Sequence, residues 1–417
     1  MSNKALGYRN SIGRFIRMRL AMLHELLIYL FSHPFSLIAA EISRLLGPVV
    51  YIPRIGYVVN SAEISRKILL DEVHFSKNGP GAAGAFWTQI LGEKALTNME
   101  GEEHRQFRAM LSTAFSDAGM IGVDLEILQR RSASLCRSLQ NGETVDLVRF
   151  ARLLTAESIF YVLGIAPEEP PSDEDYLSIF EHCDRLGEGV RIDTSRLSDD
   201  KVSRAQHELD QLTDPARSCY ENGQIRTDSV IHLMSKAGMK FEDMRAIVAV
   251  LLLIGTGTVS NAIPRTVALL IDSGELGRLR MHPELMPKAL DEGLRYVLPS
   301  PIILRSVARN THIDGHHFKA GSRVAILLYN IMRDPKHYPG SRKFDITREQ
   351  PAETRQLWFG AGPHFCPGIE LTRRQMGAVI NALIHTPGDV KIVKRRYRRK
   401  AFLPSYSKLD LKVANMF

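Results

Sequence analysis

The sequence is poor in cysteine, and no long uninterrupted apolar run lies near its N-terminus. Only four cysteines occur among 417 residues, and none belongs to a C-x-x-C pair. This argues against a disulfide scaffold and against a zinc site, and it favours a reducing cytoplasm. The apolar stretch 20–31 contains His24 and Glu25 and is too short to span a bilayer, and no secretory cleavage site follows it.

Linkers, internal repeats and low-complexity segments are also lacking. No Gly/Ser-rich or Pro-rich stretch divides the chain, so we expect one large domain over residues 1–417. Hydrophobic residues make up 44% of the sequence and charged residues 24%, which is enough to bury a sizeable core.

Apolar residues recur at helical spacing over most of the chain, which predicts a mainly α fold with small β-sheets. The predicted helices cover 62–70, 103–114, 125–139, 150–163, 203–221, 241–270 and 286–297. A β-hairpin is predicted over 49–60, and further short strands over 302–307, 323–328, 390–393 and 409–413.

Basic residues outnumber acidic ones, with 54 Lys and Arg against 46 Asp and Glu and a net charge of +8. Four arginines precede the apolar stretch 20–31, so residues 1–33 form a basic amphipathic lead segment. We expect this segment to pack against the body of the protein, and peripheral contact with a membrane is the alternative. The basic cluster 394–400 has no helix-turn-helix, finger or aromatic RNA-binding pattern beside it, so we expect a solvated turn and no nucleic-acid partner.

A cysteine in a glycine-rich, aromatic turn is the most specific feature of the chain. The stretch 359–368 reads F-G-A-G-P-H-F-C-P-G, and Pro367 suits the first turn of a helix. Cys366 is therefore predicted at a helix N-terminus, where free N–H groups and the helix dipole favour the thiolate over the thiol. A thiolate is the form that acts as nucleophile or metal ligand. A buried structural cysteine is the alternative for a lone residue of this type.

This turn resembles the haem-binding loop of the cytochrome P450 family, F-G-x-G-x-H-x-C-x-G, and matches it at every defined position. The resemblance implies the fold of that family, a triangular helix-rich prism with haem b between the long central helix and the helix after the Cys loop. It makes Cys366 the proximal thiolate ligand of the iron, with Phe359, Gly360 and Gly368 as parts of the loop. It covers residues 48–417.

Four further residues resemble the family's ligands for the haem propionates. His104 and Arg108 are four apart and share a helix face, as in the family's H-x-x-x-R pair. Arg305 and His364 are similar to two more propionate ligands. The set is chemically coherent, because carboxylates beside a low-dielectric pocket need charged or hydrogen-bonding partners.

Glu292 and Arg295 are three apart on the predicted helix 286–297, a spacing that permits an ion pair. An exposed pair of this kind would contribute only about 0.2 to 1 kcal/mol. The position resembles the family's buried E-x-x-R pair, which implies a structural role, with Arg348 as a third member.

The long helix 241–270 is apolar all round in its middle and is therefore predicted to be buried. Two glycines, several hydroxyls and Pro264 follow, which predicts a local kink or bulge and a groove for a ligand. The family pattern here is [AG]-G-x-[DE]-T. Aligned on Asn261, it keeps the threonine as Thr258 and places Gly257 at the acid position; a shift by one residue puts Val259 at the threonine position instead. In both registers the carboxylate is missing.

The resemblance also proposes substrate contacts by family position, and all of them are apolar, which implies a hydrophobic substrate. These residues are Phe86, Trp87, Leu252, Gly255, Ile302, Ile303 and Leu403. For each of them, simple core packing is the competing interpretation.

The resemblance implies a bacterial-type monooxygenase that inserts oxygen from O₂ into a terpenoid, steroid, fatty acid or natural-product intermediate of secondary metabolism. Electrons would come from an acidic ferredoxin-type donor and its reductase, a partner that a basic surface attracts. Peroxygenase, dehydration or oxidative-coupling chemistry on the same haem is the first alternative. A haem-based sensor or carrier is the second.

Overall fold

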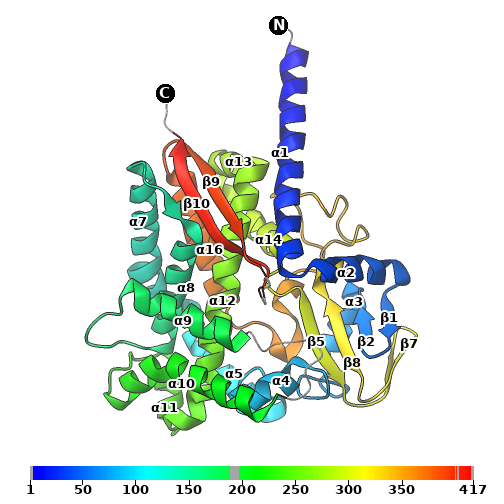
Figure 1. Ribbon diagram of the computed structural model, residues 1–417, viewed down its shortest axis with the longest axis vertical. Helices are drawn as coiled ribbons and strands as arrows, with labels where there is room; N and C mark the ends of the chain where they lie inside the picture. Colours follow the sequence, from blue (N-terminus) through cyan, green and yellow to red (C-terminus); the bar gives the residue numbers. More distant parts are fainter. Residues whose placement is uncertain (1–2, 188–196, 400, 402, 415–417) are drawn as a thin grey trace.

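The computed structural model describes residues 3–187, 197–399, 401 and 403–414, with side chains from Arg17 onward. Helices dominate it, as the periodicity predicts (Figure 1). The α-helices are α1 Asn3–Ser32, α2 Pro34–Leu46, α3 Ala62–Leu70, α4 Ala83–Leu91, α5 Gly101–Ala114, α6 Asp117–Gly122, α7 Gln129–Gln140, α8 Leu147–Leu163, α9 Asp173–Gly187, α10 Asp199–Glu221, α11 Val230–Lys236, α12 Phe241–Ser273, α13 Glu275–Met281, α14 Met286–Val297, α15 Leu328–Ile331 and α16 Ile369–His385. Shorter helical turns are η1 Val123–Leu128 (π), η2 Pro283–Leu285, η3 Leu357–Phe359 and η4 Gly362–His364 (3₁₀).

The strands form small sheets at the edges of the helical body. A five-stranded sheet has the order β1-β2-β8-β5-β3, a three-stranded sheet the order β4-β10-β9, and β6 pairs with β7. The strands are β1 Val49–Ile52, β2 Gly56–Val59, β3 Phe75–Ser76, β4 Val145–Asp146, β5 Ile302–Val307, β6 Thr311–Ile313, β7 His316–Phe318, β8 Arg323–Leu327, β9 Asp389–Tyr397 and β10 Tyr406–Ala414. In Figure 1 the five-stranded sheet lies on one side and most helices on the other.

Most predicted segments correspond closely to these elements, and two of them differ in the type of structure. The segment 125–139 begins as the π turn η1 and becomes α-helical only at Gln129. The basic cluster 394–400 is not simply a turn, because β9 continues to Tyr397 and pairs there with Tyr406 of β10. The alternation of exposed basic and half-buried side chains along this strand allows the basic residues to face water while the backbone pairs.

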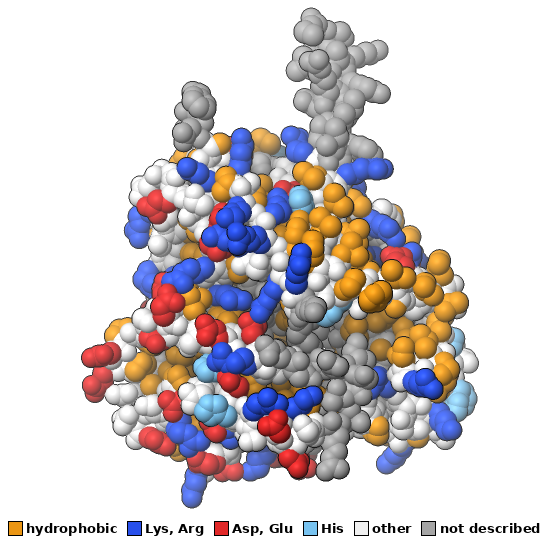
Figure 2. Space-filling model, in the orientation of Figure 1, with side chains coloured by type: hydrophobic (Ala, Val, Ile, Leu, Met, Phe, Trp, Pro, Cys, Tyr) orange, Lys and Arg blue, Asp and Glu red, His pale blue; other side chains and the backbone are white. Residues whose placement is uncertain are grey.

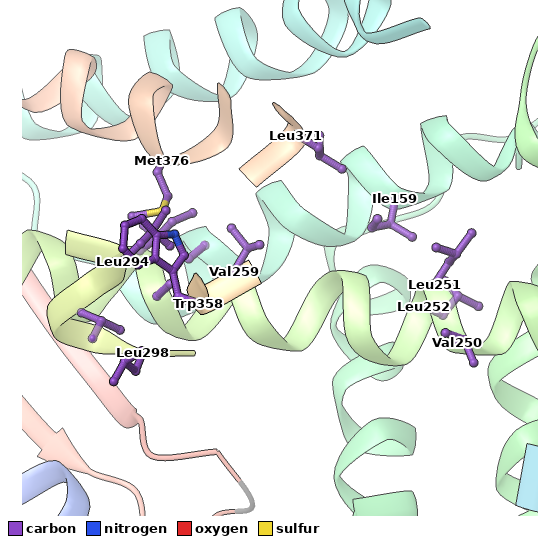
Figure 3. Close-up of a cluster of buried hydrophobic side chains, with 14 of the residues drawn as sticks. Ile159, Val250, Leu251, Leu252, Val259, Leu294, Leu298, Trp358, Leu371 and Met376 are labelled. Atoms are coloured by element: carbon purple, nitrogen blue, oxygen red, sulfur yellow. The ribbon is translucent and has the colours of Figure 1, made fainter. Parts of the chain in front are cut away.

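Helix α12 runs through the centre of the molecule and packs along α8 and α1 (Figures 1 and 3). Most of its apolar middle, including Val248 and Leu252, is buried, whereas Ile254 at the cavity is 40% exposed. The helix is α-helical without interruption from Phe241 to Ser273, so the predicted bulge is not present. The hydroxyls of Thr256 and Thr258 donate to the carbonyls of Leu252 and Ile254 within the helix, at 2.5 and 2.9 Å, and so are satisfied without leaving it.

The described side chains of the lead segment, from Arg17 onward, pack in part against the body, as expected. Its Glu25 pairs with Arg265 of α12 in a fully buried contact, and Arg265 also donates to the carbonyl of Pro404 at 3.0 Å. The Tyr29 hydroxyl donates to the carbonyl of Val297 at 3.1 Å. Among the described residues, α12 alone is a single helix long and apolar enough for a membrane span, and most of its apolar window is buried in the protein; α1 from Arg17 and α2 reach this limit only as a pair bent by 111°.

Candidate active site

The Cys366 loop lies between η3 and α16 and is shaped by its glycines. Gly360 and Gly362 have φ of 81° and 69°, and a Cβ on Gly362 would lie 2.4 Å from the carbonyl oxygen of Leu69. Only glycine therefore lets the loop approach α3 this closely. The Cys366 amide donates to the carbonyl of Phe359 at 3.0 Å, which closes the loop under the sulfur.

Cys366 lies three residues before α16, which begins at Ile369, so it stands just ahead of the helix N-terminus and Pro367 precedes the first helical turn. Burial raises the pKa of the Cys366 thiol, and a backbone hydrogen bond at Gly368 and the charge of Arg108 act in the opposite direction. The expected preference for the thiolate is thus outweighed by desolvation in the folded chain. Coordination to a metal ion would remove the proton, since the thiolate is the ligand form.

A group of basic side chains gathers beside the cysteine from four separate elements. His104 and Arg108 come from α5, His364 from η4, Arg305 from β5 and Lys77 from the end of β3. The His104 and His364 rings lie 4.2 Å apart between centroids, and Lys77 Nζ lies 3.5 Å from Nδ1 of His364. Arg108 donates to the carbonyl of Phe365 in the Cys loop at 2.5 Å.

Burial and mutual repulsion depress the pKa values of these groups. Desolvation, followed by the neighbouring Arg305, lowers the pKa of Lys77 to about 7. Desolvation and then Arg108 lower the pKa of His104 to about 4, and burial with the charge of Lys77 lowers that of His364. Burial lowers the pKa of Arg305 to about 10.

This cluster suits an anion better than a cation. Glu72, His104 and His364 place ligand atoms within 4.8 Å of one another, a spacing compatible with a metal ion. Lys77 and Arg108, however, add positive charge at the same place, which opposes a cation and stabilises carboxylates. His104 Nδ1 is buried without a hydrogen-bond partner among the described atoms, so the site has an unused polar group for such a ligand. The residues present therefore fit a haem: Cys366 would hold its iron, and the basic cluster would bind its propionates.

One cavity joins the cysteine, the basic cluster and the central helix. The cavity is open to solvent at its mouth and offers about 140 Å³ to the centres of water-sized molecules. Of the predicted site residues, Cys366, Gly368, His104, Arg108, His364, Thr258 and Gly255 line it. The apolar lining comes chiefly from α8, α12 and α16, and Figure 3 shows Ile159, Val250, Leu251, Val259 and Leu371 from these helices.

The cavity does not include six of the seven predicted substrate residues. Leu252 is fully buried and lies outside the lining, where its neighbour Leu251 stands instead. Phe86 is buried and packs edge-on against Trp87 at 5.2 Å. Ile302, Ile303 and Leu403 are partly buried and also lie outside the lining. Gly255 is the predicted substrate residue that the cavity contains.

No carboxylate lines this cavity among the described residues. Gly257 stands at the position of the missing acid, and a Cβ built on it would meet nothing within 4 Å. Thr258 lines the cavity, and its hydroxyl hydrogen is donated to the Ile254 carbonyl, so the oxygen can still accept hydrogen bonds from a water or ligand through its lone pairs.

Behind the site, Glu292, Arg295 and Arg348 form a buried network. Arg295 makes two hydrogen bonds to Glu292, at 2.6 and 2.8 Å, and Arg348 Nε donates to Glu292 Oε1 at 3.3 Å. Arg295 also donates to the carbonyls of Met332 and Ser341, which ties α14 to the segment that leads toward the Cys loop. Desolvation opposes the charge of Arg295, yet its pKa is raised because Glu292 stabilises the cation.

Sequence reasoning missed four polar residues of the cavity lining, Lys77, Thr97, Thr372 and Gln375. Lys77 follows a two-residue strand and carries no recognisable pattern of its own. Gln375 on α16 belongs to no motif. It is fully buried, and both atoms of its side-chain amide lack a hydrogen-bond partner among the described residues. Its position nine residues after Cys366, on the helix that follows the loop, is the signal that could have pointed to it.

Comparisons with known proteins agree with this geometry. A family model described as Cytochrome P450 matches residues 277–386. The chain is 24% identical over 337 residues to the putative cytochrome P450 YjiB of Bacillus subtilis (strain 168), covering 76% of this chain and 78% of that protein. It is 27% identical over 293 residues to the C-19 steroid 1alpha-hydroxylase of Sorangium cellulosum (strain So ce56), covering 69% and 73%. The crystal structure of P450BioI in complex with hexadec-9Z-enoic acid ligated acyl carrier protein superposes with a TM-score of 0.77 at 22% identity, covering 92% of this chain and 100% of that chain.

Proposed function

The chain belongs to the cytochrome P450 family of haem-dependent monooxygenases, and from this premise we propose that it oxidises a hydrophobic small molecule with O₂ and electrons from an acidic ferredoxin-type donor. The single observation that carries the proposal is the shared cavity of Cys366, the basic cluster and Thr258. When bound there, haem b supplies O₂ activation and oxygen transfer to a C–H bond.

Different residues of the chain would bind different parts of the haem. Cys366 would hold the iron, and Lys77, His104, Arg108, Arg305 and His364 would bind the two propionates. Phe359, Gly360 and Gly368 would fix the loop that carries the sulfur. The network of Glu292, Arg295 and Arg348 would hold the core behind the loop as a structural element.

Apolar residues of the cavity, such as Leu251 and Val259, would bind the substrate and exclude water from it. The substrate class extends to terpenoids, steroids, fatty acids and natural-product intermediates of secondary metabolism. A steroid hydroxylase among the relatives supports this range. The other predicted substrate contacts lie outside the cavity lining, so they would require a substrate that extends beyond the cavity. These residues are Phe86, Trp87, Ile302, Ile303 and Leu403.

Proton delivery distinguishes this chain from the family pattern. Since no acid precedes Thr258, its hydroxyl would orient a water or a substrate hydroxyl that supplies the proton. The absence of a carboxylate from the described cavity lining favours a second candidate function, a peroxygenase that uses H₂O₂ in place of O₂ and a donor.

The two candidates separate in one experiment. Substrates found by their spin-state shift are incubated with a ferredoxin, its reductase and O₂, and in parallel with H₂O₂ alone. We expect faster product formation with the donor system. Product formed only with H₂O₂ would support the peroxygenase, and ligand binding without product in either assay would favour a sensor or carrier. We place the protein in the cytoplasm, where such donors operate.

A further inference from the structure

The N-terminal part of the body leaves an extensive apolar surface in contact with solvent. Twelve of the nineteen exposed large hydrophobic side chains of the described residues fall within 20–55. Together they expose on the order of 1,000 Å², above the few hundred Å² usual for a patch on a monomer. We call this set the N-terminal apolar face: Leu20, Leu23, Leu26, Leu30, Phe31, Phe35, Ile38, Ile42, Leu45, Leu46, Tyr51 and Ile55.

The apolar face spans α1, α2 and the β1–β2 hairpin, and Figure 2 shows it as a broad hydrophobic region beside and below α1. Helix α2 is apolar on two sides. Leu37 and Ala40 pack inward, whereas Phe35 and Leu45 are 82% and 80% exposed. Packing against the body buries only the side with Leu37 and Ala40. The side with Phe35 and Leu45 remains in water, which is unfavourable unless another apolar environment covers it.

The face is fixed outward by polar contacts from the buried side of α1. Glu25 pairs with Arg265 inside the core, and Tyr29 donates to Val297. Nδ1 of His24 forms a hydrogen bond with the Tyr397 hydroxyl at 2.5 Å. Turning the exposed leucines inward would break the buried ion pair, which is costly.

The charges at the margin of the face are mostly positive. Arg17, Arg19 and Arg54 are exposed beside it, whereas the two acids of residues 17–55 are Glu25, which is buried, and Glu41, which pairs with arginines. Strand β9 lies against α1 and adds the exposed side chains of Lys394 and Arg396, and Arg399 follows the strand. Figure 2 shows basic side chains gathered over β9 and β10 next to the apolar region.

We propose that the N-terminal apolar face binds the surface of a membrane that contains anionic lipids, as a peripheral contact. Apolar side chains would enter the boundary between headgroups and acyl chains, and the flanking Arg and Lys would contact lipid phosphates. A second copy of the chain is a poorer occupant, because a symmetric contact would bring the two positive margins together. The proposal does not depend on the catalytic function.

Vesicle flotation of the purified holoprotein tests this contact. We expect binding to vesicles of equal parts phosphatidylcholine and phosphatidylglycerol, and weaker binding to phosphatidylcholine alone. The variant Ile38→Gln/Leu45→Gln should lower the partition coefficient by about tenfold or more, since two exposed apolar side chains no longer enter the lipid. The matched control Ile121→Gln/Leu125→Gln changes the same residue types, 54% and 58% exposed on α6 and η1, and should bind as the parent does.

A charge variant completes the design. Lys394→Gln/Arg396→Gln should weaken binding to the anionic vesicles severalfold and leave binding to phosphatidylcholine unchanged. Equal flotation of the parent and Ile38→Gln/Leu45→Gln, or no flotation of the parent, would overturn the proposal. So would a concentration-dependent dimer in sedimentation velocity that Ile38→Gln/Leu45→Gln abolishes in the absence of vesicle binding, because the face would then belong to a second copy. Thermal unfolding of each variant shows that the fold is retained.

Discussion

At the scale of single residues, Gly257 is the most informative departure from the family pattern. The helix has room for a side chain there, since a Cβ would meet no atom within 4 Å. The variant Gly257→Asp would place a carboxylate one residue before Thr258, where it can relay protons. We expect at least about a twofold gain in product formed per electron pair in the O₂-driven reaction, measured by product and H₂O₂ quantification.

Two matched variants show whether the gain comes from proton transfer. Gly257→Asn has similar size and no acid, so it should not increase coupling. Gly257→Asp/Thr258→Ala should lose the gain and release more H₂O₂, because the hydroxyl that orients the proton donor is gone. An equal gain in the Asn variant would attribute the effect to packing on α12.

The depressed pKa of His104 predicts acid sensitivity of the haem-free protein. Desolvation and the charge of Arg108 lower this pKa from 6.5 in the unfolded chain to about 4 in the fold. Between these values the unfolded state binds the proton and the folded state does not, so stability is full above pH 6.5 and is lost as the pH falls toward 4. Urea unfolding midpoints at pH 7.5, 6 and 5 should therefore decline, and His104→Asn should flatten the decline; a parallel decline in that variant would contradict the assignment.

At the scale of elements, the buried network of α14 is the clearest link between sequence pattern and stability. Glu292 is fully buried and accepts hydrogen bonds from Arg295, Arg348 and the backbone of Asp345. Glu292→Gln should lower the free energy of unfolding by about 3 to 5 kcal/mol, because two buried guanidinium groups lose their counterion.

Chemical denaturation measures this loss, and Glu284→Gln is the control in the preceding turn. Glu284 is exposed and pairs with His282 at the surface, so its replacement should change the unfolding free energy by no more than about 0.5 kcal/mol. Similar small changes in both variants would mean that the network does not hold the core.

The position and type of the helices and strands were the most predictable part of the fold. The side of a helix on which each residue lies was the least predictable part. The strongly amphipathic helix α14 and the hairpin β1–β2 follow from periodicity and turn residues, and α3 matches its predicted range. The middle of α12 is apolar all round, so its pattern does not reveal which side faces the cavity. Successive residues differ by about 100° around a helix, which is why Leu251 lines the cavity and the predicted Leu252 does not. Lys77 was not predictable, since only the fold brings the residue after β3 next to η4.

At the scale of the whole molecule, the net charge of +8 favours an acidic electron donor. Attraction between exposed opposite charges is screened by salt, with a Debye length of about 10 Å at 0.1 M ionic strength. Stopped-flow reduction by an acidic ferredoxin should therefore slow by about tenfold or more between low and high salt. A salt-independent rate would argue against an electrostatically guided donor.

The proposed function depends on a bond between Cys366 and haem iron, and the spectrum of the reduced protein with CO measures this bond most directly. We predict the strongly red-shifted Soret band of thiolate ligation in the parent protein and its loss in Cys366→Ala. A band at the position typical of imidazole ligation, or an unchanged band in Cys366→Ala, would contradict the account.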